Sequence, residues 1–386
     1  MIKIFFIIVL LLLNILTVPL IINKIETVSR WHIRKGGVIL KTEDMLKALT
    51  EAPGISGSEE DVAHLLRNYF ARLTDEAFID KFNNVIGIKK GTSSAGKVMM
   101  AAHIDQIGFL VHTFEEGGFI RIAPIGGHDP RVLPGQSVII YGKEIIRGVI
   151  GTTPPHLQKS GDTGKVTALE ELYVDTGLKE EDVKARLRIG DPVLFDNVCT
   201  RMAGGYYSAA AMDNRAGVLV LLETLRILKG LKHQWDVYMV GTVQEEVGTR
   251  GGALTAYEIK PDVGIAIDVT FGDFPGIPDR QTSKLGGGGA VAVGPNFHPQ
   301  LTERLIALAQ DWEIPFQKEF NPRPGGTDAV SMQIAARGVP MVQVSIPLRY
   351  MHTTVETLDL QDIRRAGRLL ALFAAHIDEI HGEVVG

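Results

Sequence analysis

Nearly continuous apolar runs alternate along the chain with amphipathic segments. The apolar runs include residues 97–102, 237–243 and 263–267. Runs of this kind are typical of strands that are buried on both faces of a sheet. Residues 43–50 and 62–70 are amphipathic and predict helices, the second of them capped by Ser58. A strongly apolar helix is predicted after Met212. The alternation predicts an α/β fold with a doubly wound, mixed sheet.

The pattern changes between about residues 106 and 203. Short β-rich runs are separated there by Gly and Pro, at residues 118–122, 137–141, 145–150 and 192–195. This punctuation is typical of a small β-barrel or β-sandwich. Because chemically active residue types lie on both sides of the segment, residues 106–203 are predicted to form a domain inserted into the α/β domain, whose two parts are residues 43–105 and 204–386.

The first 39 residues do not share either pattern. Residues 5–22 are almost entirely Ile, Leu, Val and Phe, a length just sufficient to cross a bilayer. One lysine precedes the run and four basic residues follow it, so the positive-inside rule predicts an anchor that leaves the rest of the chain facing the cytoplasm. A cleaved secretory signal fits less well, because no small-residue cleavage site follows the run.

A second interpretation is that residues 1–39 result from a mis-assigned start. Residues 34–37 can be encoded by a purine-rich run that resembles a bacterial ribosome-binding site, and Leu40 can be encoded by a TTG start codon; Met45 is the other candidate. The mass of the intact native protein separates the two interpretations. A mass that includes residues 1–39 would exclude a later start.

Composition limits the classes of protein that need to be considered. A chain of 386 residues is long enough for about two domains of ordinary size. The formal charge of −5 gives no reason to expect a nucleic-acid partner. Cys199 is the single cysteine, which excludes an intrachain disulfide and fits a reducing compartment. The predicted location is therefore the cytoplasm.

Residue types that bind metals follow the buried runs. In open α/β sheets, ligands bind outside the carboxyl ends of the strands. Two imidazoles and several carboxylates suit a pair of Zn²⁺ or Co²⁺ ions, with one carboxylate bridging ions about 3.5–4 Å apart. The pattern therefore predicts a two-metal hydrolase and does not choose between the two metals. The candidate residues are His103, Asp105, Asp213, Glu245, Glu246, Asp268 and His352.

Several of these residues also have simpler interpretations. Asp213 alone would fit an ordinary helix N-cap, but the other segments favour a metal bridge, and the helix dipole stabilises its ionised form. Asp328 follows Gly326 in a glycine-rich loop, where it is predicted either to line a substrate cleft or to form an Asx turn. Arg215 and Arg250 are predicted to pair with nearby carboxylates.

Short segments in one order along the chain resemble those of the tetrahedral (TET) metallo-aminopeptidases, a family that includes glutamyl and deblocking aminopeptidases. The resemblance extends from about Glu43 to the C-terminal helix and leaves the apolar leader outside. Gln106 departs from the pattern, because many family members have Glu there, and a tuning effect at most is expected. The matching segments are residues 102–108, 212–215, 244–251, 266–268, 325–329 and 349–352.

The resemblance implies a division of roles among these residues. Asp213 would bridge two metal ions, with His103 and Asp268 completing one site and Glu246 and His352 completing the other. Glu245 would be the general base, and Asp105 would orient the imidazole of His103. Asp328 and Gly326 would contribute to substrate binding.

The resemblance also implies an activity and an assembly. The activity is removal of the N-terminal residue from short peptides, whose free amine would face a carboxylate of Glu245, Asp268 or Asp328. The assembly is a homo-oligomer, a tetrahedral dodecamer in this family, formed partly through the inserted β domain as a dimerisation element. The side-chain preference is not predicted; Lys284 and Arg323 are the candidates for binding an acidic first residue.

Two other functions remain alternatives. A glycoside hydrolase of the endoglucanase type needs two carboxyl groups about 5–5.5 or 6.5–9.5 Å apart, which leaves the two histidines unexplained. Cellulose hydrolysis that survives chelation would support it. A non-catalytic, membrane-tethered scaffold that binds peptides would be expected to have lost a ligand or the base, whereas all of these residues are present. Two bound ions per chain would oppose the scaffold.

Overall fold

The computed structural model describes residues 41–157, 165–323 and 325–380, and from Thr42 onward the chain forms one compact unit. Within these ranges no helix is both long enough and apolar enough to cross a membrane. The predicted anchor at residues 5–22 and the alternative start at Leu40 lie outside the described residues, so both stay predictions.

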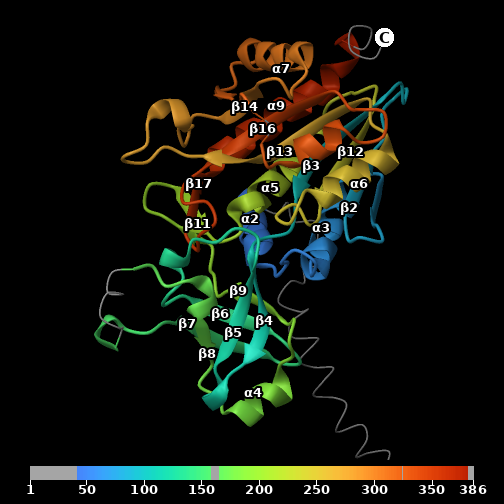
Figure 1. The fold of residues 1–386 in the computed structure, drawn as a ribbon. Helices are drawn as coiled ribbons and strands as arrows, with labels where there is room; N and C mark the ends of the chain where they lie inside the picture. The colour runs from blue at the N-terminus through green and yellow to red at the C-terminus, as the bar shows by residue number, and fades with distance from the viewer. Residues whose placement is uncertain (1–40, 158–164, 324, 381–386) are drawn as a thin grey trace, which may run out of the picture. The chain divides into compact units, whose positions relative to one another are not determined.

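An eight-stranded mixed sheet forms the centre of the unit (Figure 1). Its four middle strands, β12, β3, β13 and β16, run parallel to one another. On either side, β2, β14 and β15 run in the opposite direction, and the edge strand β1 runs in the same direction as the middle strands. The predicted mixed α/β sheet is confirmed. In spatial order the strands are β1 (Glu76–Ile79), β2 (Val85–Lys89), β12 (Asp236–Thr242), β3 (Lys97–His103), β13 (Val263–Phe271), β16 (Met341–Leu348), β14 (Gly289–Val293) and β15 (Phe316–Phe320).

Helices cover both faces of this sheet, which explains why its middle strands are buried at nearly every position and mostly apolar. Met99 and Ala101 of β3 pack in the cluster that contains residues of α6 and α8. Ala102 points the other way, toward Gly217 of α5, where a Cβ atom would lie only 3.1 Å from the Ala102 side chain. The helices are α2 (Thr42–Glu51), α3 (Glu60–Leu73), α5 (Met212–Leu228), α6 (Arg250–Ile259), α7 (Pro299–Asp311), α8 (Asp328–Gln333) and α9 (Leu360–His376).

The inserted β segment is a closed six-stranded barrel (Figure 1). It closes where Phe109 of β4 pairs with Val193 of β9, and Phe109 lies in its fully buried core. The inserted small β domain is confirmed, and of the two predicted forms the barrel is the one observed. In spatial order its strands are β4 (Gly108–Phe114), β5 (Ile120–Ile125), β8 (Tyr173–Asp175), β7 (Ile145–Gly151), β6 (Ser137–Tyr141) and β9 (Pro192–Phe195), and helix α4 (Glu180–Arg186) lies between β8 and β9.

A three-stranded sheet lies outside both the barrel and the main sheet. It pairs β10 (Thr200–Arg201) with β11 (Tyr206–Ala209) and β11 with β17 (Glu356–Asp359). Since β11 leads directly into α5 and β17 follows the loop of His352, this small sheet holds two segments of the candidate site side by side. The domain boundaries proposed at residues 106 and 203 stay a prediction.

Two local predictions were wrong. Ser58 does not cap α3, because the helix begins at Glu60 and is preceded by Glu59, whose carboxylate accepts a hydrogen bond from the Gly57 amide instead. Arg215 is fully buried, and within the described ranges no carboxylate forms an ion pair with it. It donates to main-chain carbonyl groups at the end of α2 and in the turn that follows, at Leu49, Ala52 and Gly54.

Candidate active site and metal centre

The predicted metal-binding residues come from five different elements. His103 is the last residue of β3, and Glu245 and Glu246 follow the end of β12. Asp268 lies inside β13, which continues to Phe271 rather than ending at residue 267 as the apolar run suggested. Asp213 is in the first turn of α5, and His352 is in the loop between β16 and β17. The site therefore lies at the carboxyl ends of the parallel strands, as expected for an open α/β sheet.

Asp213 is the centre of the cluster. Its Oδ1 atom lies 3.1 Å from Nε2 of His103, and its Oδ2 atom lies 3.4 Å from Nε2 of His352. The two oxygens of one carboxylate thus face two different imidazoles. Asp268 Oδ1 lies 3.8 Å from Nε2 of His103, and Glu246 Oε1 lies 3.5 Å from Nε2 of His352. Each histidine therefore has Asp213 on one side and a second carboxylate of its own.

The donor set fits divalent metal ions. His103, Asp213 and Glu246 each offer one ligand atom, and these atoms lie within 4.8 Å of one another. Imidazole nitrogens and carboxylate oxygens without a thiolate suit Zn²⁺ or Co²⁺. The group is also almost entirely removed from solvent, since His103 and Asp213 are 2% and 7% exposed.

The pKa shifts of the clustered side chains also favour a cation site. Burial raises the pKa of Glu245, and although His103 opposes this rise, the carboxylates of Asp268 and Asp328 add to it. Burial likewise raises the pKa of Asp268. Hydrogen bonds to Asp213 and Glu246 raise the pKa of His352 to about 11. Carboxylates thus outnumber imidazoles in a buried space, and a bound cation would supply the compensating charge.

Asp105 fixes the backbone that carries both glutamates. Its side chain is fully buried, and its Oδ1 and Oδ2 atoms accept from the backbone amides of Glu245 and Glu246 at 3.1 and 3.2 Å. Oδ2 also accepts from the hydroxyl of Ser56 at 2.6 Å. Oδ1 lies 3.5 Å from Nδ1 of His103, while the Asp105 carbonyl oxygen lies closer to that nitrogen, at 3.1 Å. Asp105 thus connects β3 to the turn after β12.

Glu356 has the matching position on the other side and was missed from the sequence. It is 2% exposed, and its two oxygens accept from the backbone amides of His352 and Asp213 at 2.7 and 3.1 Å. It therefore holds the two segments that carry the central aspartate and the second histidine. The signal in the sequence was a carboxylate four residues after His352, and Glu356 lies outside the segment 349–352 that carried the resemblance.

The two residues predicted to contact substrate differ in their surroundings. Asp328 is the first residue of α8 and is buried; its Oδ2 accepts from the Thr242 hydroxyl at 2.5 Å, and Oδ1 receives no hydrogen bond from the described residues. Its carboxylate bonds outside the glycine-rich loop, which opposes the Asx-turn interpretation. Gly326 lies in the exposed part of that loop. Their contribution to substrate binding stays a prediction.

A mixed sheet with a buried His, Asp and Glu cluster at its strand ends, interrupted by a closed barrel, defines a hydrolase of the metallopeptidase class. The chain belongs to the M42 glutamyl aminopeptidase family, whose model matches residues 83–369. The predicted family and the predicted enzyme class, an aminopeptidase, are thereby confirmed.

Similar proteins agree with this assignment. The chain is 38% identical to a lysyl aminopeptidase of Pyrococcus furiosus over 83% of this chain and 93% of the relative. The structure of aminopeptidase APDkam598 from Desulfurococcus kamchatkensis matches with a TM-score of 0.84 at 37% identity, covering 89% of this chain and 98% of that one. The TET1 peptidase of Pyrococcus horikoshii, described as able to assemble into a tetrahedron or a large octahedral shell, matches with a TM-score of 0.77 at 30% identity, covering 86% and 99%.

Proposed function

We propose that this chain is a two-metal aminopeptidase that removes the N-terminal residue from short peptides. The observation that carries the proposal is the position of Asp213, whose two oxygens face the imidazoles of His103 and His352. A carboxylate placed in this way can bridge two ions. His103 and Asp268 would complete one metal site, and Glu246 and His352 the other.

Bound Zn²⁺ or Co²⁺ ions supply Lewis acidity toward a peptide carbonyl and toward water. The residues of the chain then have separate tasks. Glu245 Oε2 lies 3.9 Å from Nε2 of His103, beside the proposed ligands. This suits a general base that takes a proton from the attacking water and returns it to the leaving amine.

Substrate orientation would fall to the acidic groups beside the cluster. The free amine of a peptide is a cation, so a nearby carboxylate aligns the first residue with the reacting centre. Asp328 is a candidate because one of its oxygens has no hydrogen-bond partner and its charge influences Glu245. Gly326, in the loop that leads to α8, would border the same cleft.

The test is hydrolysis of aminoacyl p-nitroanilides by purified protein before and after chelation. We expect activity with at least one substrate, loss of that activity on chelation, and recovery with Zn²⁺ or Co²⁺ to two ions per chain. Carboxymethyl cellulose serves as the matched control substrate. Peptidase activity that survives complete metal removal would contradict the two-metal mechanism, and chelator-resistant cellulose hydrolysis would instead favour the glycosidase.

We also propose that the protein forms a closed homo-oligomer, assembled partly through its inserted barrel, which would act as a dimerisation domain at residues 106–203. The support is the similarity to the P. horikoshii TET1 peptidase across nearly the full length of that chain. The native mass of the purified protein, measured by light scattering, is expected to correspond to twelve chains. A monomeric mass at micromolar concentration would overturn the assembly.

A further inference from the structure

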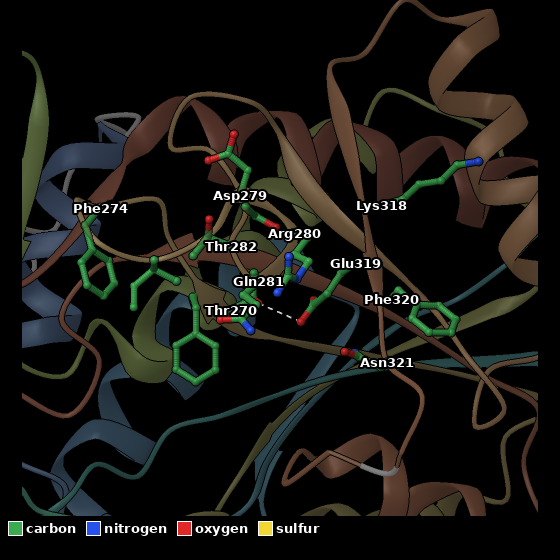
Figure 2. A pocket seen from close by; sticks show the side chains of 13 residues that line it. Thr270, Phe274, Asp279, Arg280, Gln281, Thr282, Lys318, Glu319, Phe320 and Asn321 are labelled. Carbon is green, nitrogen blue, oxygen red and sulfur yellow. Dashed lines mark hydrogen bonds between the residues drawn. The ribbon is translucent and has the colours of Figure 1, made fainter.

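A pocket of about 700 Å³ opens beyond the candidate metal centre. It is bordered by the end of β13, the loop over residues 274–283 and the last part of β15 (Figure 2). Thr270, in its wall, is two residues after Asp268 on the same strand. Alternate residues of a strand point to the same face and are separated by about 6.5–7 Å. The pocket therefore begins roughly one side-chain length from a proposed metal ligand.

Glu319 presents an incompletely bonded carboxylate to this pocket. Its Oε1 atom accepts from the Thr270 hydroxyl at 2.8 Å, while Oε2 is buried and receives no hydrogen bond from the part of the chain that the structure describes. Polar groups of Ser345 and Asn321 lie near the carboxylate without satisfying Oε2. Burial raises the pKa of Glu319. A buried acceptor left unpaired is costly, and a ligand that carries N–H donors would satisfy it.

The other lining residues form apolar walls and a charged rim. Phe271, Phe274 and Ile277 supply apolar surface from the end of β13 and the following loop. Arg280 and Lys318 are exposed, and Lys318 points away from the other labelled side chains in Figure 2. Within the described parts of the chain, no ion pair joins either cation to Glu319. The buried carboxylate is thus not neutralised by the pocket itself.

We propose that this pocket receives the side chain of the first residue of the peptide and that Glu319 selects a basic side chain, lysine or arginine. The inference rests on the proposed aminopeptidase function. A long aliphatic stem would lie along the apolar walls, and its terminal ammonium or guanidinium group would donate to Oε2 of Glu319. Lys284 and Arg323, considered from the sequence for an acidic first residue, do not line the pocket.

The wild-type enzyme tests this directly with substrates matched in length. Lysyl and norleucyl p-nitroanilides differ in the terminal ammonium group, and the glutamyl compound reverses the charge. We expect kcat/KM for lysyl to exceed that for norleucyl about 10- to 100-fold, the range of a charge-assisted hydrogen bond, with glutamyl the slowest. A norleucyl or glutamyl preference would overturn the inference and leave the aminopeptidase intact. No hydrolysis of any substrate would overturn both.

Substitutions locate the effect within the pocket. Glu319→Gln keeps the size of the side chain and removes its charge, so the ratio of lysyl to norleucyl kcat/KM should fall about 10- to 100-fold. Glu303→Gln makes the same change at an exposed residue of α7 that does not line the pocket, and should change that ratio less than about threefold, because an exposed charge is screened by solvent. Equal ratios in wild type and Glu319→Gln would overturn the role of Glu319.

Discussion

A Glu245→Gln variant is expected to bind its metal ions normally and to lose about 10²- to 10⁴-fold in kcat, the usual contribution of a general base. The amide keeps the shape of the side chain but cannot accept the proton of the attacking water. The backbone amide of residue 245 would still donate to Asp105, so the turn that carries Glu246 should keep its position. The measurements are kcat on the best p-nitroanilide and metal content per chain.

Glu258→Gln is the matched control for this variant. Glu258 is exposed on α6, and the chemical change is the same. We expect the control to retain wild-type kcat. If Glu245→Gln kept more than a tenth of the activity, Glu245 would not be the base. If it lost metal ions together with activity, Glu245 would be a ligand rather than the base.

The central sheet could be predicted because strands buried on both faces appear in the sequence as continuous apolar runs. Every residue from 98 to 102 of β3 packs against a helix or a neighbouring strand, so the run is continuously apolar. The closure of the barrel could not be predicted from a comparable pattern. It depends on Phe109 pairing with Val193, residues more than eighty positions apart, and alternating strands of this kind fit a barrel and a sandwich equally well.

The residues of the candidate site also fall into those that could be predicted from the sequence and those that could not. His103 and Asp268 could be selected because each belongs to a buried strand or ends one, where a polar residue needs a reason to be present. Glu356 and Glu319 could not be selected. Glu356 acts on backbone amides, which any sequence provides. Glu319 belongs to a strand with mixed exposure, and its pocket combines three segments that the sequence does not show to be close.

An Asp213→Asn variant is expected to show the largest loss of all, to below about 10⁻⁴ of wild-type kcat/KM, together with loss of bound metal. The carboxylate faces both histidines. Burial raises its pKa, but hydrogen bonds from the two imidazoles outweigh that effect and lower it, so the carboxylate is ionised and able to serve two ions. An asparagine side chain has one oxygen and no charge. It can face one histidine as an acceptor but cannot bridge two cations.

Comparison with Glu356→Gln distinguishes the proposed bridging ligand, Asp213, from the residue that holds its backbone in place. The glutamine would keep one acceptor for the amides of Asp213 and His352 and lose the other, so metal affinity should fall about 10- to 100-fold, the usual effect of removing a group that orients ligands. Asp311→Asn, on the exposed surface of α7, should change neither quantity. Metal content after dialysis against a graded chelator series orders the variants. An Asp213→Asn protein that retained two ions with wild-type affinity would show that Asp213 does not bridge, and the division of ligands around it would have to be abandoned.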